Sequence, residues 1–329
     1  MMLSALLLIE RGEMIFIVPR SFTSGPYFRL FREKFFRTIL LKNIHVFNSR
    51  KKAFKRDNVL QENIILKAVN EKLHPDDEVI ISTSESMEDI EQAEISQYAF
   101  QEVIDMESKQ KILYIPLNHQ DKEIIRLFKK WNNSFERNFI KISTGPVVAF
   151  RKSDYLVDNN DSSKANTNPL IWITNTKPMK LIFPSDKNKK QYIIDCSTTQ
   201  NILVKNMNYV LLRRFSTKDD ISRLIATPYF AENFTHTKIG IENHLNYIYK
   251  YKGELNKYEV MGIAALLNST LFDTYFRTFN GNTQVSATEL QDIPLPDMSK
   301  IESIGVEILK SNVFTQHRID SIINEKILA

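Results

Sequence analysis

An uninterrupted apolar run near the start of the chain limits the fold more than any other stretch. The run is Met14-Ile-Phe-Ile-Val18, and Pro19 ends it. A strand without alternating polar residues is typical of a parallel sheet that is covered on both faces. We therefore expect an α/β fold in which this strand has parallel neighbours. Ligands bind at the carboxyl edge of such sheets, so the loop at 20–26 is a candidate pocket edge with Arg20, Ser21, Phe22 and Gly25. Gly25 with Pro26 is alternatively no more than a turn.

The segments around this strand predict two helices and two more strands. Residues 2–11 read as the last turns of a helix that Gly12 stops, and residues 27–39 have a helical apolar period with the cations on the other face. Residues 44–47 and 59–69 have the composition of strands. These elements are too few to cover the strand at 14–18. Either one edge of the sheet is exposed, or another chain supplies the missing half.

The rest of the chain alternates short strands with a few helices, and we place a domain boundary near 118–122. The first predicted domain covers residues 1–118 and the second covers 119–329. The predicted strands lie at 79–81, 112–117, 147–151, 170–174, 179–183, 192–195 and 209–215, and the predicted helices at 87–106, 122–131, 258–278 and 300–327.

Positive charge is concentrated in one window. Residues 29–56 contain ten Lys or Arg against the single acid Glu33, so this window is +9, whereas the whole chain is +5. Such a patch is typical of a protein that binds a polyanion. Phe54 lies inside the densest part of this window, where a nucleic-acid base could stack on it, although it could equally pack into the core. The candidate DNA-binding cations around it are Arg50, Lys51, Lys52, Lys55 and Arg56.

Composition excludes several other classes of protein. The single cysteine, Cys196, excludes an internal disulfide framework and a cysteine-rich zinc site, and it fits a reducing cytoplasm. The apolar residues 1–9 are too short to span a bilayer and lack the features of a signal peptide. We expect a soluble, cytoplasmic protein without a membrane partner.

Seven short strings stand in order along residues 14–296. They are Ile17-Val-Pro-Arg-Ser-Phe-Thr-Ser-Gly-Pro-Tyr-Phe28, Val59-Leu-Gln-Glu-Asn-Ile64, Ile142-Ser-Thr-Gly-Pro-Val-Val148 with Phe150-Arg151, Asn168-Pro-Leu-Ile-Trp172, Leu211-Leu-Arg-Arg-Phe-Ser216, Ile241-Glu-Asn-His-Leu-Asn246 and Asn280-Gly-Asn-Thr-Gln-Val285. Together they resemble the gamma-class, PstI/BsuBI-type adenine-N6 DNA methyltransferases of restriction–modification systems.

The resemblance implies a Rossmann-like catalytic domain followed by a mixed α/β target-recognition domain. It also implies the activity, which extrudes an adenine from double-stranded DNA and methylates its N6 from S-adenosylmethionine. The resemblance further implies a cognate restriction endonuclease that acts on the same site. Phe54 resembles the family's aromatic residue that packs on the extruded base.

Two family motifs have no counterpart in residues 1–329. The family's Asn/Asp-Pro-Pro-Tyr/Phe motif orients the amino group of the base, but this sequence has no Pro-Pro dipeptide. The family's glycine-rich cofactor loop is missing as well, because the eight glycines are dispersed and the nearest pair is Gly253 and Gly262. We therefore expect an incomplete Rossmann-like domain that is inactive alone and acts with a second chain carrying the N-terminal half. A non-catalytic DNA-binding remnant is the alternative, and a basic interaction protein without nucleic acid is a third.

The second predicted domain offers further DNA-binding candidates. Arg213 and Arg214 are neighbours on a strand and face opposite sides, so we expect one to face DNA and the other to be in a salt bridge. Asn280-Gly-Asn282 is a natural turn at positive φ. Glu242 and His244 are too few ligands for a metal, so no metal site is predicted. The residues next to the turn that could contact phosphate or bases are Asn282, Thr283 and Gln284.

Overall fold

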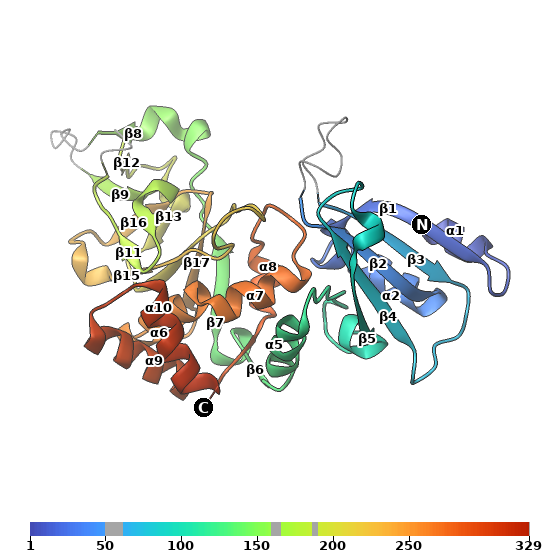
Figure 1. Ribbon diagram of the computed structural model, residues 1–329. Helices are drawn as coiled ribbons and strands as arrows, with labels where there is room; N and C mark the ends of the chain where they lie inside the picture. Colours follow the sequence, from blue (N-terminus) through green and yellow to red (C-terminus); the bar gives the residue numbers. More distant parts are fainter. Residues whose placement is uncertain (50–61, 159–165, 186–189, 329) are drawn as a thin grey trace. The chain divides into compact units, whose positions relative to one another are not determined.

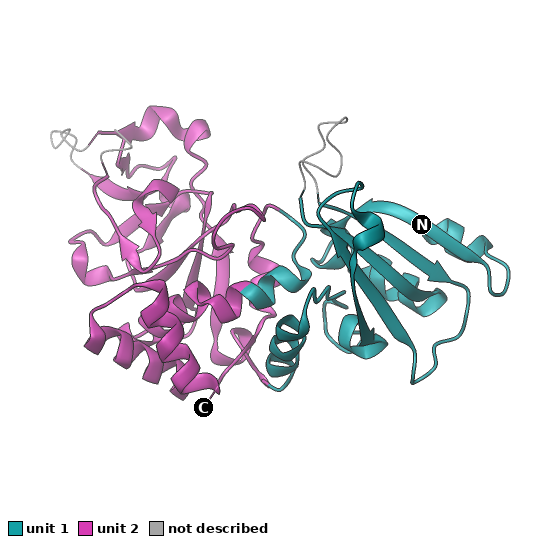
Figure 2. Cartoon of the chain, viewed as in Figure 1, with its two compact units in different colours: residues 1–130, 274–282 teal, residues 131–273, 283–329 magenta. Residues whose placement is uncertain are grey.

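The computed structural model describes residues 1–49, 62–158, 166–185 and 190–328 (Figure 1). They form two compact units, which Figure 2 colours separately. Unit 1 comprises residues 1–130 and 274–282, and unit 2 comprises residues 131–273 and 283–329. No helix among the described residues is long and apolar enough to cross a bilayer.

Unit 1 is built on one five-stranded sheet with the strand order β1-β3-β2-β4-β5. β2 and β4 are parallel, and the other neighbours are antiparallel. One continuous core joins the sheet to its two N-terminal helices through residues such as Phe35, Ile44 and Leu66. The elements are α1 (Met2–Leu7), β1 (Glu13–Pro19), η1 (Arg20–Thr23), α2 (Arg29–Thr38), β2 (Leu40–Phe47), β3 (Asn63–Val69), β4 (Glu78–Ser84), η3 (Ile90–Gln92), β5 (Glu94–Ala99), α4 (Phe100–Val103) and α5 (His119–Lys129).

β1 corrects the prediction made from its apolar run. The strand pairs antiparallel with β3 and lies at the edge of the sheet, instead of between parallel neighbours. Only one of its faces is covered, because Met14 is buried whereas Ile15 and Ile17 are 64% and 54% exposed. The prediction that the strand is buried on both faces is therefore wrong, and its alternative, an exposed edge, describes unit 1.

Unit 2 combines two larger sheets with a helical layer. A five-stranded sheet has the order β13-β16-β9-β12-β8, a four-stranded sheet has the order β15-β14-β17-β7, and two strand pairs are β10-β11 and β18-β6. The strands are β6 (Asn133–Ser134), β7 (Ile140–Thr144), β8 (Leu156–Val157), β9 (Thr167–Ile171), β10 (Thr176–Lys177), β11 (Lys180–Leu181), β12 (Tyr192–Ile194), β13 (Leu203–Lys205), β14 (Tyr209–Arg213), β15 (Ala226–Tyr229), β16 (Lys238–Ile241), β17 (Leu245–Lys250) and β18 (Pro294–Leu295). The helices are η4 (Glu136–Asn138), η5 (Ala149–Tyr155), η6 (Ile173–Asn175), η7 (Gln200–Ile202), η8 (Ala231–Asn233), α6 (Lys257–Asn268), α7 (Thr270–Phe279, shared with unit 1), α8 (Ala287–Gln291), α9 (Met298–Ser311), α10 (Gln316–Ile323) and η9 (Asn324–Leu328).

Two helices of unit 2 approach so closely that only glycine fits between them. A Cβ atom at Gly262 of α6 would lie 2.0 Å from the carbonyl oxygen of Ile301 in α9. A Cβ atom at Gly305 of α9 would lie equally close to the carbonyl oxygen of Tyr258. The two glycines therefore set the distance of this helix crossing.

The mixed α/β class is confirmed, as are most of the shorter predicted elements. The helix predicted at 87–106 is wrong, because this region forms η3, β5 and the short helix α4. Residues 112–117 make an isolated bridge at Leu113 instead of a strand, and most of 147–151 belongs to the 3₁₀ helix η5.

The two long C-terminal helices are each interrupted. Ser269 is extended between α6 and α7, and its hydroxyl accepts the backbone N–H of Phe272 at 3.2 Å, which caps the second helix. Asn312 adopts the left-handed conformation after α9, and the Thr315 side chain caps α10. Local capping thus overrides a continuous apolar period.

Candidate nucleic-acid interface

Arg20 joins three of the predicted site segments within unit 1. It directly follows β1, and its side chain is buried. Its Nη1 lies 3.2 Å from Glu62 Oε2, and its Nη2 donates to the carbonyl oxygens of Arg277 at 2.6 Å and Thr278 at 3.1 Å. Arg20 therefore anchors the loop after β1 to the residue that follows the Phe54 segment and to the end of α7. It points into the protein and does not present its charge to solvent.

The turn at 280–282 packs directly against Arg20. A Cβ atom at Gly281 would lie 2.7 Å from Arg20 Cγ, so this glycine is required by the close approach. The glycines with positive φ are Gly25 and Gly253, so the prediction of positive φ at this turn is wrong. Asn282 is half-buried, and its backbone N–H donates to Asn280 Oδ1 at 3.2 Å.

A second arginine fixes the loop after β1, and the sequence pattern missed it. Arg32 lies on α2, where the helical period placed every cation in solvent, yet its side chain is fully buried. Its guanidinium donates five hydrogen bonds of 2.6–2.8 Å, to the carbonyl oxygens of residues 22, 24, 25, 110 and 111. The prediction of a solvated cationic face is therefore wrong at Arg32. A planar five-donor group can satisfy carbonyls that no apolar side chain could, which explains a buried charge here.

The four loop residues predicted at the pocket edge have different environments. Phe22 is 6% exposed and packs edge-to-face against Phe31, with ring centroids 5.9 Å apart, so it belongs to the core. Gly25 has φ +76°, a conformation that favours glycine. Ser21 and Gly25 keep partial exposure, whereas Arg20 and Phe22 are buried.

Phe54 and the cations Arg50, Lys51, Lys52, Lys55 and Arg56 lie outside the described residues. The residues on either side of them are described. The backbone N–H groups of Asn48 and Ser49 donate to the carbonyl oxygens of Ser84 and Glu85. On the other side, the Glu62 carbonyl accepts the backbone N–H of Arg20 at 2.6 Å. The described residues Ser49 and Glu62 thus lie at the same end of the sheet as the loop after β1.

The side chains of Arg213 and Arg214 in unit 2 point to opposite sides, as expected of neighbouring residues at the end of a strand. Arg213 donates from Nε to Thr176 Oγ1 at 3.1 Å and from Nη2 to the Thr176 carbonyl, and burial lowers its pKa. It is therefore anchored by hydrogen bonds, where the sequence predicted a salt bridge. Arg214 faces the other way and contacts Asn243, Phe215 and Gln284.

The remaining predicted residues pair with the end of β14. Phe215 and Gln284 form an antiparallel bridge, the backbone N–H of Ser216 donates to the Thr283 carbonyl at 3.0 Å, and the N–H of Val285 donates to the Arg214 carbonyl at 2.7 Å. Thr283 is exposed, and Gln284 is half-buried. Phe215, which the sequence reasoning missed, is 43% exposed beside Arg214. Its signal was the one already used for Phe54, an aromatic next to cations.

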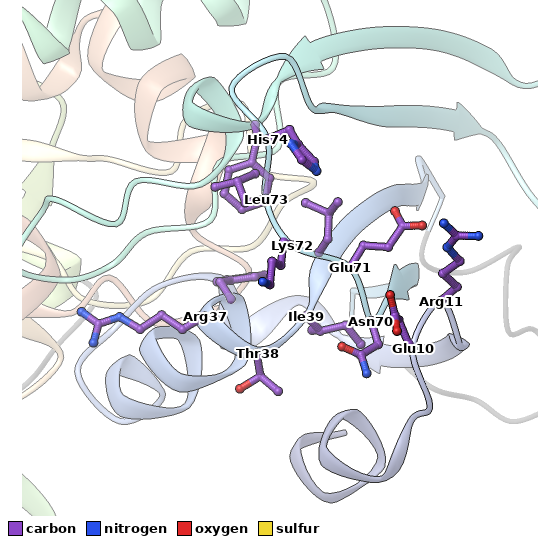
Figure 3. A pocket seen from close by; sticks show the side chains of 13 residues that line it. Glu10, Arg11, Arg37, Thr38, Ile39, Asn70, Glu71, Lys72, Leu73 and His74 are labelled. Carbon is purple, nitrogen blue, oxygen red and sulfur yellow. The ribbon is translucent and has the colours of Figure 1, made fainter.

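A cavity of about 700 Å³ in unit 1 lies at the end of the sheet away from Arg20. Figure 3 shows the side chains that line it. It is lined by residues next to the start of β1 and the end of β3, such as Arg11, Asn70 and Lys72. Glu13 pairs with Val69 at this end, whereas Pro19 pairs with Asn63 at the end that carries Arg20. None of the predicted site residues that the structure describes lines this cavity.

Glu242 and His244 are a hydrogen-bonded pair through the Nδ1 atom of the histidine. Within the described ranges, no three His, Cys, Asp or Glu side chains are grouped so that they could hold a metal ion.

S-adenosylmethionine does not fit the residues present. The chain after β1 forms η1 with the buried Arg20, and all eight glycines stand apart from one another, so no glycine-rich turn is available to cradle it.

Comparison with known proteins identifies the relatives of this chain. It is 35% identical over 327 residues to the type II methyltransferase M.BsuBI of Bacillus subtilis. It is 35% identical over 317 residues to the type II methyltransferase M.PstI of Providencia stuartii. By sequence, this chain is similar to type II methyltransferases of the PstI/BsuBI type. The resemblance carried by the seven strings is thereby confirmed.

The two matches cover 98% and 96% of this chain but only 63% and 61% of the relatives. The chain therefore spans about three fifths of the length of the curated relatives it matches. No family model matches the sequence.

The fold has a counterpart among solved structures. The type IIL restriction–modification enzyme MmeI, solved in complex with DNA, aligns with 96% of this chain and 46% of its own, at 11% identity and a TM-score of 0.52. At this identity the likeness concerns the fold alone.

Proposed function

We propose that residues 1–329 are the base-stacking and DNA-recognition part of a site-specific DNA adenine-N6 methyltransferase. The observation that carries this proposal is the 35% identity to M.BsuBI and M.PstI along almost the whole chain. The substrate is double-stranded DNA, and the methyl donor is S-adenosylmethionine. A cognate restriction endonuclease would act on the same site.

Unit 1 corresponds in this proposal to an incomplete Rossmann-like catalytic domain, and unit 2 to the target-recognition domain. Support for unit 1 comes from Arg20 and Arg32, which together hold the loop after β1, Glu62 and the end of α7 in one hydrogen-bonded frame. Phe54 lies in the sequence between Ser49 and Glu62, and Glu62 belongs to this frame. Its ring would pack on the extruded adenine, and a base–aromatic stack of about 1–3 kcal/mol offsets much of the unstacking cost.

Methyl transfer further requires the Asn-Pro-Pro-Tyr motif and the cofactor loop. Neither occurs in residues 1–329. We propose that a polypeptide carrying these motifs completes the sheet on β1. β1 exposes the side chains of Ile15 and Ile17, and the neighbouring helix α1 exposes those of Leu3, Leu6 and Leu7. An unpaired edge strand and a cluster of exposed apolar side chains are typical of a surface to which another polypeptide binds.

Two assays on the purified chain test the proposal. Fluorescence anisotropy with a labelled duplex should show binding whose affinity falls steeply with salt, as counterions are released from DNA. With tritiated S-adenosylmethionine and DNA, the chain alone should transfer no methyl group. Transfer should appear when the part of M.BsuBI outside the matched residues is co-expressed with the chain, and mass spectrometry should identify the product as N6-methyladenine. If the chain alone transfers a methyl group, the missing motifs are not required and this part of the proposal is refuted. If the chain does not bind DNA, the proposed DNA recognition is refuted.

In the complemented protein, Phe54→Ala should reduce methyl transfer more than DNA affinity. A matched control is Phe139→Ala, which removes a half-exposed aromatic whose ring lies 4.8 Å from Lys252 Nζ. It should leave both quantities almost unchanged. Equal losses of transfer and affinity in Phe54→Ala would instead indicate a packing role.

A non-catalytic DNA-binding remnant is the second candidate. The absence of a Pro-Pro dipeptide from this sequence favours it. The two candidates differ in one result, because a remnant would bind DNA but gain no methyl transfer when the missing motifs are supplied.

A further inference from the structure

The end of β14 carries a fixed cluster of Arg214, Phe215 and Gln284 in unit 2. The backbones of residues 214–216 and 283–285 are hydrogen-bonded to each other, so the two segments hold one another in place. The Arg214 guanidinium carbon lies 5.5 Å from the centre of the Phe215 ring, and Phe215 is 43% exposed. The cluster thus combines a cation and an exposed aromatic on a rigid support.

Hydrogen bonds orient the Arg214 guanidinium. When the Gln284 amide is turned so that its oxygen faces Arg214, that oxygen accepts from Nε at 2.9 Å and from Nη2 at 2.7 Å. In addition, Nη1 donates to the Asn243 carbonyl oxygen at 3.2 Å. These bonds use three of the five N–H groups of the guanidinium, which leaves one each on Nη1 and Nη2 for a ligand.

The chemistry of the cluster selects an acceptor-rich ligand. A guanidinium offers only donors, and its Nη1 and Nη2 atoms present them in one plane. In the major groove, guanine presents two acceptors, N7 and O6, whereas adenine and cytosine present a donor amino group and thymine a methyl group. A phosphate is the other acceptor-rich partner. Phosphate contacts carry no sequence information, whereas reading a guanine needs two donors aligned with N7 and O6, which a guanidinium held in one plane provides.

We propose that Arg214, positioned by Gln284, reads a guanine in the DNA target. This inference rests on the proposed DNA-recognition function. Arg214 donates to N7 and O6 of the guanine, and Gln284 acts as a positioning residue by fixing the plane of the guanidinium. Phe215 limits the approach of the neighbouring base pair from the exposed side of the arginine.

The experiment begins with the full chain and a library of randomised DNA duplexes. Duplexes that the wild-type chain retains define its preferred sequence. Each guanine of that sequence is then replaced in turn by 7-deazaguanine, which lacks the N7 acceptor. At one guanine, the replacement should weaken wild-type binding by about 5-fold or more. Arg214→Met should bind the normal and the 7-deaza duplex with equal affinity, and Gln284→Leu should lose most of the preference.

A matched control is Arg151→Met. Arg151 also lies 5.5 Å from an exposed aromatic ring, that of Phe150. Any loss in this variant should be the same on both duplexes. Each variant is compared with the wild-type chain by tryptophan fluorescence in urea, so that misfolding is recognised.

The outcomes separate this inference from the function on which it rests. If the wild-type chain retains no duplex, DNA recognition fails and the guanine contact fails with it. If it selects a sequence but Arg214→Met keeps the 7-deazaguanine penalty, only the guanine contact is refuted. If Arg214→Lys keeps full affinity and preference while Arg214→Met weakens all duplexes equally, Arg214 contacts phosphate and the inference is again overturned.

Discussion

Replacing Arg32 by lysine should destabilise unit 1 strongly, although the charge is kept. The guanidinium donates five hydrogen bonds to carbonyl oxygens, whereas an ammonium group can donate three. At least two buried carbonyls therefore lose a charged donor. At about 1.5–3 kcal/mol for each such bond, the expected loss is about 3–6 kcal/mol. A loss of this size is a large share of the typical stability of a domain, about 5–15 kcal/mol.

The chain allows the two units to be observed separately. Both tryptophans, Trp131 and Trp172, belong to unit 2, so their fluorescence reports that unit, whereas circular dichroism reports both. In urea, Arg32→Lys should shift an unfolding transition that is seen by circular dichroism and leave the tryptophan transition nearly unchanged.

Arg37→Lys is the control on the same helix. The Arg37 side chain is 67% exposed and pairs with Glu33 at 3.2 Å, so its replacement should change stability by less than about 0.5 kcal/mol. If Arg32→Lys shifts the transition no more than Arg37→Lys does, the buried donor network does not stabilise unit 1 and the reasoning is refuted.

Two further predictions concern one residue in each unit. Burial lowers the pKa of His45 below its ordinary value of 6.5, so the unfolded chain binds a proton more readily than the folded one. The free energy of unfolding should therefore fall as the pH drops below about 6.5, by at most about 1.4 kcal/mol per pH unit. Urea unfolding at pH 7.5 and 5.5 should show a smaller fall in His45→Gln than in the wild-type chain, and equal falls would contradict this prediction. Gly262→Ala would place a Cβ atom 2.0 Å from the Ile301 carbonyl oxygen and should cost about 1–3 kcal/mol or more by tryptophan fluorescence in urea. The control is Gly253→Ala: a Cβ atom there meets no atom within 4 Å, but the residue has φ +89°. This variant should lose about 1 kcal/mol of stability. Equal losses of stability in the two variants would show that the helix crossing can relax.

Local patterns predicted many elements because they depend on neighbouring residues. The helical period at 27–39 corresponds to α2, and the apolar run at 14–18 corresponds to β1. The same patterns failed where a long-range partner decided the outcome. Residues 87–106 resemble a helix by their period, yet part of this region pairs with β4 as the strand β5. Pairing between strands depends on distant residues, which a local period does not contain.

The candidate site divides in the same way. The sequence alone predicted which segments form the site, namely the loop after β1, the Phe54 segment and the residues around Arg214 and Gln284, because residue types and family strings are properties of the chain itself. Only the tertiary structure decided what each side chain does there. Arg20 was predicted at a pocket edge and Arg32 on a solvated helix face, but both are buried donors to backbone carbonyls. Arg213 and Arg214 are identical in type, and their roles separate because one meets Thr176 and the other meets Gln284. A charged side chain is buried or left facing solvent according to which acceptors the fold brings to it, and those acceptors come from residues far away in the sequence.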